Sequence, residues 1–345
     1  MLVKDSITRA QEAIEAIKKG EMIIVMDDED RENEGDLVYA GIFSTAQKVN
    51  FMAQEARGLI CVSITKQIAR DLDLPPMVSK NSSNHETAFT VSIDAKAAKT
   101  GISAYERDMT INLMCHPNAN ADDFVRPGHI FPLIAKEGGV LERTGHTEAS
   151  VDICKLAGLK PVSVICEIMK EDGQMPGRGD KFLLDFAKKH SLKILYVSDL
   201  IEYRLQFEQL IKEISKDEMD FFNTKVQKFE FCDHLNRIHC VFKFGENKEP
   251  FVKFHLIGED LELLQYGEKY NALLKSIEIL KERGGYLVCM RRDANHDMKM
   301  LGIGAQILQS LGVKDFRLLS FSNVNENQFS LISGFGLKIL EKIEV

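Results

Sequence analysis

Apolar runs alternate with amphipathic stretches along the N-terminal part of the chain. Apolar side chains recur at helical spacing between Ser6 and Lys19, and Gly20 separates them from a short apolar run at residues 22–26. This spacing predicts a helix that ends near the glycine, followed by a buried strand. The same reasoning predicts further helices at 45–54, 66–72, 108–115, 147–158, 182–190 and 198–214, and strands at 37–40, 59–64, 162–169 and 194–197. A polar loop that begins at Asn81 runs into another, alternating strand that ends at Asp94.

The most charged stretch of the chain lies between two of these strands. Residues 27–36 hold seven carboxylates and one arginine, and the apolar runs on either side place them on a loop. Carboxylates that are held together repel one another unless a positive charge lies among them. Arg31 can neutralise one of them, and a hard divalent cation such as Mg²⁺, which prefers oxygen ligands, suits the others. A solvated acidic loop is the alternative that composition leaves open.

Length and composition narrow the class of protein. A chain of 345 residues predicts two domains, and 44% apolar with 28% charged residues is the composition of a globular protein. The net charge of −8, without a basic stripe, argues against nucleic-acid or anionic-membrane partners. Because neither a signal peptide nor a membrane-spanning run is evident, we expect a cytoplasmic protein. Seven scattered cysteines suggest reduced, mainly buried thiols, and Cys61 reads as a core strand residue.

Two histidines lie in segments that could aim their rings. His129 lies in a proline-bracketed turn, and His146 lies where a loop opens a helix. The free backbone N–H groups at that helix start, together with Arg143 and Thr147, could form an anion cradle beside a metal-ligating histidine. Simpler alternatives also stand, because a histidine in a turn is usually a surface group and Thr147 could merely cap the helix.

Two further segments carry polar groups of interest. Glu167 interrupts the apolar strand 162–169, where a buried carboxylate would suit proton transfer and an exposed strand end would have no such role. The segment 100–107 gathers hydroxyl groups, Tyr105 and Arg107 near a glycine. Such a segment could hold a phosphate or could only cap the following helix.

Three segments, taken in order, resemble the motifs of one enzyme family. They are Asp27-Asp28-Glu29-Asp30-Arg31-Glu32-Asn33-Glu34-Gly35-Asp36, Arg126-Pro127-Gly128-His129 and Arg143-x-Gly145-His146-Thr147-Glu148-Ala149. Their order and spacing are similar to those of the 3,4-dihydroxy-2-butanone 4-phosphate synthases of riboflavin biosynthesis, over residues 1–204. The resemblance implies an α+β fold for this domain, a layered sandwich with a mixed sheet.

The resemblance also implies an activity and a set of roles. Members of that family convert D-ribulose 5-phosphate to L-3,4-dihydroxy-2-butanone 4-phosphate and formate, need Mg²⁺ or Mn²⁺, and are homodimers with sites at the interface. A loop that corresponds to the one with Tyr105 and Arg107 faces the substrate in the family, and Asp27 to Asp30 would shape the acidic loop. The implied metal ligands are Glu32 and His146, the catalytic groups are His129 and Glu167, and the further substrate contacts are Arg31, Asp36, Arg143, Thr144, Gly145 and Thr147.

A second domain is expected at residues 205–345, with the charged stretch 212–218 as its boundary. Residues 302–320 are similar to a late segment of GTP cyclohydrolase II, and 253–255 and a helix at 270–283 fit the same alignment. That family holds Zn²⁺ with three cysteines, whereas residues 255–288 contain none. We therefore expect a smaller, degenerate α/β domain without zinc or cyclohydrolase activity.

Residues 291–297 stand where that family has its arginine-rich segment. His296 and Asp297 there could bind a metal or lie in a surface loop, and Cys232, Cys240 and Cys289 do not reproduce the zinc spacing. Two rival hypotheses remain: a bifunctional enzyme that keeps the cyclohydrolase activity, and a non-catalytic regulator that binds a sugar phosphate or nucleotide. Retention of every matched metal, phosphate and proton-transfer position argues against the regulator.

Overall fold

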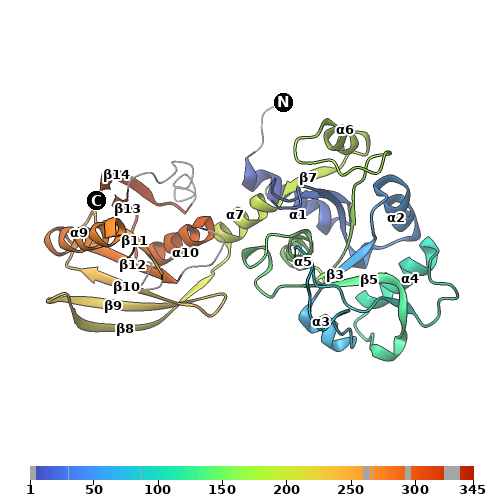
Figure 1. Cartoon of the computed structure of the whole chain (residues 1–345), viewed down its shortest axis with the longest axis horizontal. Helices are drawn as coiled ribbons and strands as arrows, with labels where there is room; N and C mark the ends of the chain where they lie inside the picture. Colours follow the sequence, from blue (N-terminus) through green and yellow to red (C-terminus); the bar gives the residue numbers. More distant parts are fainter. Residues whose placement is uncertain are drawn as a thin grey trace. The chain divides into compact units, whose positions relative to one another are not determined.

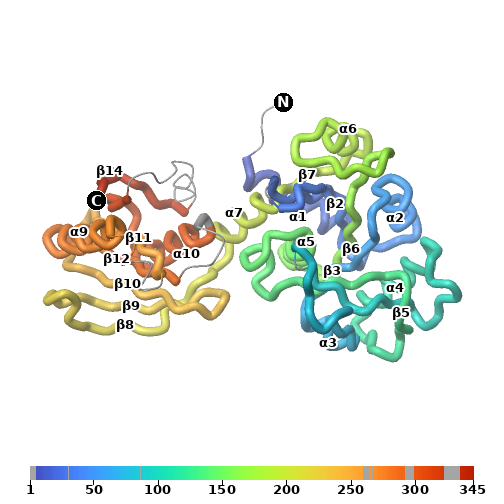
Figure 2. Tube along the Cα trace, viewed as in Figure 1, coloured from blue at the N-terminus to red at the C-terminus, as the bar shows by residue number. Residues whose placement is uncertain are grey.

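The computed structural model describes residues 5–29, 31–85, 87–258, 265, 267–291, 297–321 and 335–345. The chain divides into two compact units, Met1–Tyr203 and Arg204–Val345, and each is described by itself. Figure 1 labels their elements and Figure 2 follows the backbone. Each unit has helices packed on a mixed seven-stranded sheet, which confirms the predicted fold class. Within the described residues, no helix is long and apolar enough to span a membrane.

The first unit places the two strands that flank the acidic loop side by side. β1 (Ile23–Met26) pairs antiparallel with β2 (Gly35–Ala40), and β2 pairs with β6 (Val162–Glu167). The remaining strands are β3 (Cys61–Thr65), β4 (Ile93–Ala95), β5 (Phe124–Ala135) and β7 (Lys193–Tyr196), and the strand order is β4-β5-β3-β6-β2-β1-β7. Parallel pairs join β1 to β7 and β3 to β5.

Helices cover both faces of this sheet (Figure 1). Side chains alternate along β2, so that Leu37 and Tyr39 belong to one apolar core whereas Asp36 and Val38 point to the opposite layer. α1 (Ser6–Lys18) and α5 (His146–Leu156) lie on the layer that Asp36 faces. The other core is covered by α2 (Ala46–Phe51), α3 (Lys66–Asp71), α4 (Ala104–Cys115) and α6 (Lys181–Lys189).

The segment around His129 corrects one prediction. Residues 126–133 belong to strand β5 and not to a free turn. Ile93 pairs with Ile130 and Asp94 pairs with Val125, so residues 126–129 stand out as a bulge between consecutive partners. A proline, which has no N–H to donate, is tolerated where the ladder is interrupted. Pro127 does mark an interruption of regular structure, but the interruption is a bulge inside strand β5 and not a turn.

The second unit has a mixed sheet of its own. Its strands are β8 (Ile211–Phe221), β9 (Thr224–Asp233), β10 (Ile238–Phe244), β11 (Phe251–Ile257), β12 (Gly285–Arg291), β13 (Asp315–Ser320) and β14 (Lys338–Glu344), in the order β14-β13-β11-β12-β10-β9-β8. α9 (Gly267–Arg283) covers an apolar cluster that contains Leu280 and Leu287. α10 (Asp297–Ser310) packs on the other face, where Gly304 closely approaches Phe254.

The helix predicted at 198–214 is shorter than expected. α7 (Val197–Phe207) ends at Phe207, and β8 begins at Ile211. The charged stretch 212–218 is therefore a strand, and it is not a boundary between domains. β8 is an edge strand of its sheet, where charged side chains stay in solvent and discourage pairing with another chain.

Candidate active site

The acidic loop folds around one buried carboxylate. Asp27 Oδ1 accepts a hydrogen bond from the Glu34 N–H at 2.9 Å, and Oδ2 accepts one from the Glu32 N–H at 3.1 Å. Arg31 Nη1 donates to the same Oδ2 at 2.7 Å. Backbone N–H groups and a guanidinium thus offset the charge of Asp27, which is fully buried. Asp27 shapes the loop as predicted, and Asp30 lies outside the described residues.

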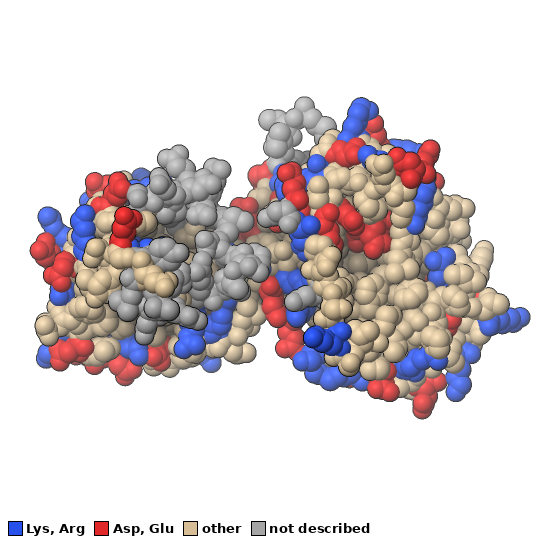
Figure 3. Space-filling view, in the orientation of Figure 1, with Lys and Arg blue, Asp and Glu red and all other residues tan. Residues whose placement is uncertain are grey.

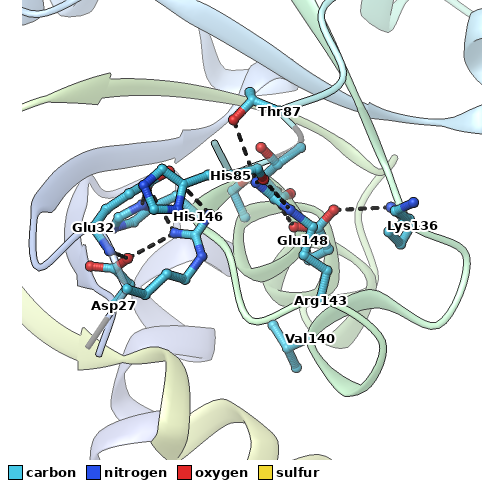
Figure 4. Close-up of polar contacts among 12 residues, drawn as sticks. Asp27, Glu32, His85, Thr87, Lys136, Val140, Arg143, His146 and Glu148 are labelled. Carbon is cyan, nitrogen blue, oxygen red and sulfur yellow. Dashed lines mark hydrogen bonds and ion pairs between the residues drawn. The ribbon is translucent and has the colours of Figure 1, made fainter. Parts of the chain in front are cut away.

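Glu32 and His146 lie together beside Asp27, as Figure 4 shows. Glu32 Oε2 is 3.4 Å from His146 Nδ1 and 2.8 Å from Arg31 Nη1. One ligand atom from each of Asp27, Glu32 and His146 lies within 4.8 Å of the other two. Two carboxylate oxygens and an imidazole nitrogen form a donor set that suits a divalent cation. The structure therefore brings together the two predicted ligands and adds Asp27 as a third candidate.

Charges within this group shift its pKa values. Burial acts to raise the pKa of Glu32, but His146 and Arg31 outweigh it and lower that pKa to about 2. Burial acts to lower the pKa of His146, but Asp36 and Glu32 outweigh it and raise that pKa to about 9. Burial also raises the pKa of Asp36, since that carboxyl is almost completely enclosed. Glu32 is thus held as a carboxylate against a cationic neighbour.

Asp36 and Glu167 meet at one end of the sheet. They are direct partners across the β2–β6 pair, so their side chains leave the sheet on the same face. Glu167 is half-buried, and its Oε2 accepts a hydrogen bond from the Leu59 N–H at 2.9 Å. A Cβ on Gly58 would lie 2.4 Å from the Glu167 carbonyl oxygen, so the glycine is required for this close approach. Asp36 Oδ1 is 3.9 Å from His146 Nε2.

The N-terminus of α5 meets two guanidinium groups. Gly145 is the N-cap, and no side chain caps the helix there, so the alternative that Thr147 is the cap is wrong. A Cβ on Gly145 would lie 2.4 Å from Arg143 Nη1 and 3.0 Å from Arg31 Nη2. Free N–H groups and two arginines therefore converge on one point, which is the arrangement that binds an anion. Thr147 is buried in the first turn of the helix, and Thr144 is half-buried just before it.

Contacts with Glu148 and His85 hold Arg143 in place (Figure 4). Its guanidinium pairs with the buried Glu148 at 2.5 Å and donates to the carbonyl oxygen of His85 at 2.7 Å. Glu148 also accepts a hydrogen bond from the Lys136 N–H. Arg143 is thus oriented by fixed partners, and only part of its charge is left to attract a ligand.

His129 forms a separate pair with Asp94. Asp94 accepts hydrogen bonds from the His129 N–H and from Nδ1 of the ring, both at 2.8 Å. Gly101 lies so close that a Cβ there would come within 2.6 Å of His129 Nδ1. No pattern in the sequence singles out Asp94, because it lies on a predicted strand and outside the three motifs. The side chain of Asp94 is almost fully buried, whereas that of His129 is 43% exposed.

The sheet register relates His129 to the acidic group. Phe131 of β5 pairs with Cys61 of β3, and Cys61 pairs with Ile165 of β6. His129 lies two residues before Phe131, and Glu167 lies two residues after Ile165. Because β3 runs parallel to β5 and antiparallel to β6, both residues are displaced from this row toward the same end of the strands. Glu167 lies on the same face of the sheet as Asp36, whereas the bulge at residues 126–129 interrupts the regular alternation of side chains at His129. His129 and Asp36 are nonetheless three strands apart in the sheet.

Tyr105 and Arg107 lie apart from this group. The side chain of Tyr105 is 73% exposed. Burial lowers the pKa of Arg107, and the groups that act on its charge, Tyr39 and Cys166, belong to the core on the opposite face from Asp36. Cys61 is buried in β3, as the sequence indicated. In Figure 3, acidic side chains gather on one part of the first unit, whereas lysine and arginine are scattered.

Fold and site together define a layered α/β protein in which a group of candidate metal ligands adjoins a helix N-terminus approached by two arginines. Residues 11–203 match the family model of 3,4-dihydroxy-2-butanone 4-phosphate synthase, and residues 274–344 match that of GTP cyclohydrolase II. The 3,4-dihydroxy-2-butanone 4-phosphate synthase of Helicobacter hepaticus is 64% identical over 351 residues, which cover 98% of this chain and 99% of the relative. The chain belongs to the 3,4-dihydroxy-2-butanone 4-phosphate synthase family, whose members are enzymes of riboflavin biosynthesis.

Two solved structures extend the comparison. A two-domain 3,4-dihydroxy-2-butanone 4-phosphate synthase from A. baumannii has a TM-score of 0.83 and 38% identity, and the match covers 98% of this chain and 99% of the other. A 3,4-dihydroxy-2-butanone 4-phosphate synthase in complex with two magnesium ions has a TM-score of 0.54 and 39% identity, and the match covers 57% of this chain and 97% of the other. The first structure matches both units and the second only part of the chain.

Proposed function

We propose that the first unit converts D-ribulose 5-phosphate to L-3,4-dihydroxy-2-butanone 4-phosphate and formate as a metal-dependent carbon–carbon lyase. The observation that carries this proposal is the group of Asp27, Glu32 and His146, whose ligand atoms lie within 4.8 Å of one another. This group adjoins the N-terminus of α5, where Arg31 and Arg143 converge. A substrate with a phosphate at one end and vicinal oxygens at the other needs both features.

The residues present fit a hard divalent cation such as Mg²⁺ or Mn²⁺. Asp36 Oδ1 and His146 Nε2 are buried, and neither has a hydrogen-bond partner within the described part of the chain. Buried polar atoms without partners are costly, and a cation with its water shell would satisfy them. Glu32 and His146 would hold the ion, with Asp27 beside them. When bound, the ion would stabilise the negative charge that develops on the substrate oxygens.

The chain's own groups supply the remaining steps. The α5 N-terminus with Arg31, Arg143, Thr144, Gly145 and Thr147 binds the phosphate and so orients the distant reacting end. Asp36 contacts the substrate hydroxyls. Glu167, fixed by the Leu59 N–H, moves a proton at its carboxylate, and His129, held through Nδ1 by Asp94, exchanges one at Nε2. The contribution of Tyr105 and Arg107 to substrate binding and the cytoplasmic location stay predictions.

A homodimer with the sites at its interface completes the proposal for the first unit. Apolar side chains are exposed near the start of α4 and the start of β5, where a solvated surface would disfavour them. They are Ile102, Tyr105, Met109 and Val125, of which Tyr105 is the most exposed. In a homodimer that buries this surface, a residue such as Tyr105 of one subunit would reach the active site of the other subunit. Within its own chain, Tyr105 does not approach that site.

The second unit has a non-catalytic role in this proposal. Cys240 and Cys289 are neighbours across β10 and β12, but the zinc spacing of the cyclohydrolases is absent from the sequence. Among the described residues, the group of three metal ligands lies in the first unit, while His296 lies outside the described part. We expect neither stoichiometric zinc nor formate released from GTP. Zinc analysis and a GTP turnover assay on the purified protein check this.

Activity of ligand variants tests the main proposal. Glu32→Gln and His146→Ala should lose formate release from ribulose 5-phosphate by at least about a hundredfold, because each removes a metal ligand. Glu15→Gln, on the exposed side of α1, is the control. A folded Glu32→Gln protein that kept its full rate with Mg²⁺ would show that the assignment is wrong.

A further inference from the structure

Arg178 and Gly177 form a clamp on the acidic loop from outside the predicted motifs. The Arg178 N–H donates to Asn33 Oδ1 at 2.7 Å, and Arg178 Nη1 donates to Asp28 Oδ1 at 3.3 Å. These contacts join residues 145 and 150 positions apart in the sequence, and they hold the loop on either side of Glu32. We infer that Arg178 is a positioning residue that presets the acidic loop for its divalent cation.

Gly177 makes the contact with Asn33 possible. A Cβ on Gly177 would lie 2.5 Å from Asn33 Nδ2, so a larger residue would push the two segments apart. Asn33 itself has a φ of 56°, in the left-handed region that asparagine tolerates better than most residues. The turn next to Glu32 therefore has a left-handed residue at Asn33, and the Gly177–Arg178 backbone supports it.

The guanidinium of Arg178 is anchored at its other side by an aromatic ring. It lies 4.2 Å from the centroid of the Tyr196 ring, within cation–π range. Tyr196 is the direct partner of Met26 in the β7–β1 pair, and Met26 is the last strand residue before the acidic loop. The ring is thus fixed at the base of the loop while the guanidinium reaches Asp28. Arg178 therefore connects the base of the acidic loop, through Tyr196, to Asp28 and Asn33 within the loop.

This clamp has an energetic consequence for metal binding. The loop carboxylates repel one another, and inside the loop Arg31 already binds both Asp27 and Glu32. Arg178 adds a second positive charge from outside and reduces the number of loop conformations. A ligand set that is ordered before the cation arrives binds more tightly, because less ordering has to accompany binding. The inference rests on the proposed metal site at Asp27, Glu32 and His146.

Manganese binding to the full chain tests the inference without using activity. Free Mn²⁺ is followed by electron paramagnetic resonance as the ion is titrated into each variant. We expect Arg178→Ala to raise the Kd for Mn²⁺ by about tenfold, a typical effect of outer-shell partners. Tyr196→Leu should raise it by a similar factor, whereas Tyr196→Phe keeps the ring and should match the wild type. Lys170→Ala is the matched control, because Lys170 pairs with Asp180 in the same segment.

Two further readouts separate this role from a general loss of structure. At saturating Mn²⁺, kcat of Arg178→Ala should stay within about twofold of the wild type, because the ligands themselves are unchanged. Hydrogen exchange of residues 28–34 should become faster in Arg178→Ala and stay unchanged in Lys170→Ala.

The outcomes separate the clamp from the metal site. If the wild type binds Mn²⁺ and Arg178→Ala binds it equally well, the clamp is wrong and the metal site stands. If the wild type and Glu32→Gln show the same weak uptake of Mn²⁺, the metal site fails and the clamp loses its purpose.

Discussion

At the scale of single residues, two glycines do more than allow turns. Gly58 leaves room for Glu167, and Gly145 leaves room for two arginine side chains at a helix start. Both positions bring backbone and charged groups closer than any Cβ would permit. The geometry of the site therefore depends on two glycines that have no side chain with which to take part in the reaction.

Gly145→Ala should weaken substrate binding more than it weakens the fold. The new Cβ would displace Arg143 Nη1, the same nitrogen that pairs with the buried Glu148. We expect KM for ribulose 5-phosphate to rise about tenfold through loss of a phosphate contact, with a smaller loss of Tm because the Arg143–Glu148 pair is disturbed. Gly267→Ala, whose Cβ would meet nothing within 4 Å, is the control. An unchanged KM would contradict the anion cradle.

Glu167→Gln should separate proton transfer from structure. The amide oxygen can still accept the Leu59 N–H, so the sheet edge is kept, but the side chain no longer exchanges a proton. We expect kcat to fall by about 10²–10⁴-fold, the usual contribution of a general acid or base. Steady-state formate release and circular dichroism together check this. A variant with normal kcat would leave Glu167 with a structural role only.

At the scale of elements, a buried charge cluster ties a hairpin to the sheet of the second unit. Asp233 lies at the end of β9, and its Oδ2 binds Arg237 Nε at 2.7 Å and His239 Nε2 at 3.0 Å. His239 is fully buried and accepts a hydrogen bond from the Arg291 N–H of β12. Removing one partner from such a cluster leaves the others buried without compensation.

The pH dependence of stability should report this cluster. Burial acts to raise the pKa of Asp233, but His239 and Arg237 hold that pKa far below its usual value of 3.8. A depressed pKa gives stability that is fully present above the unfolded value and is lost as pH falls through the folded value. Asp233→Asn should therefore destabilise the second unit by about 2 kcal/mol at pH 7.

The difference between this variant and the wild type should shrink as pH falls below the ordinary aspartate pKa. Thermal unfolding of the full chain between pH 3 and pH 7 measures it, with Asp315→Asn on an exposed strand position as the control. If the difference in stability between the wild type and Asp233→Asn did not depend on pH, the charge of Asp233 would not be the source of its stabilising effect.

At the scale of the whole molecule, every residue assigned to the synthase site lies in the first unit. We expect a chain that ends after Phe207 to keep formate release from ribulose 5-phosphate within a few fold. The shortened chain keeps Leu205, which in the full chain packs on Gly302 within the second unit, so Leu205→Ser is included to limit aggregation. Complete loss of activity in a folded, dimeric fragment would assign the second unit a direct role in catalysis.

The sequence by itself determined most elements of the first unit and the candidate residues of its site, although strand β5 was not expected. Helical and strand periodicities depend on neighbours within a few residues, so α1, α3, α6 and β1 lie where the pattern predicts them. The acidic loop, His129 and His146 could be recognised because their motifs are continuous in the chain, and Glu167 because a carboxylate there interrupts an apolar strand. The helix expected at 198–214 was overestimated because a charged edge strand resembles a helix or linker in composition.

Only the tertiary structure decided which of these residues meet. Asp36 faces Glu167 because of the β2–β6 register, and Asp94 holds His129 because β4 and β5 lose register at a bulge. Asp27 became a third candidate ligand through the path of the loop, and Arg178 reached that loop from a distant segment. Pairing between strands far apart in sequence depends on the packing of the whole domain, and no local pattern encodes it.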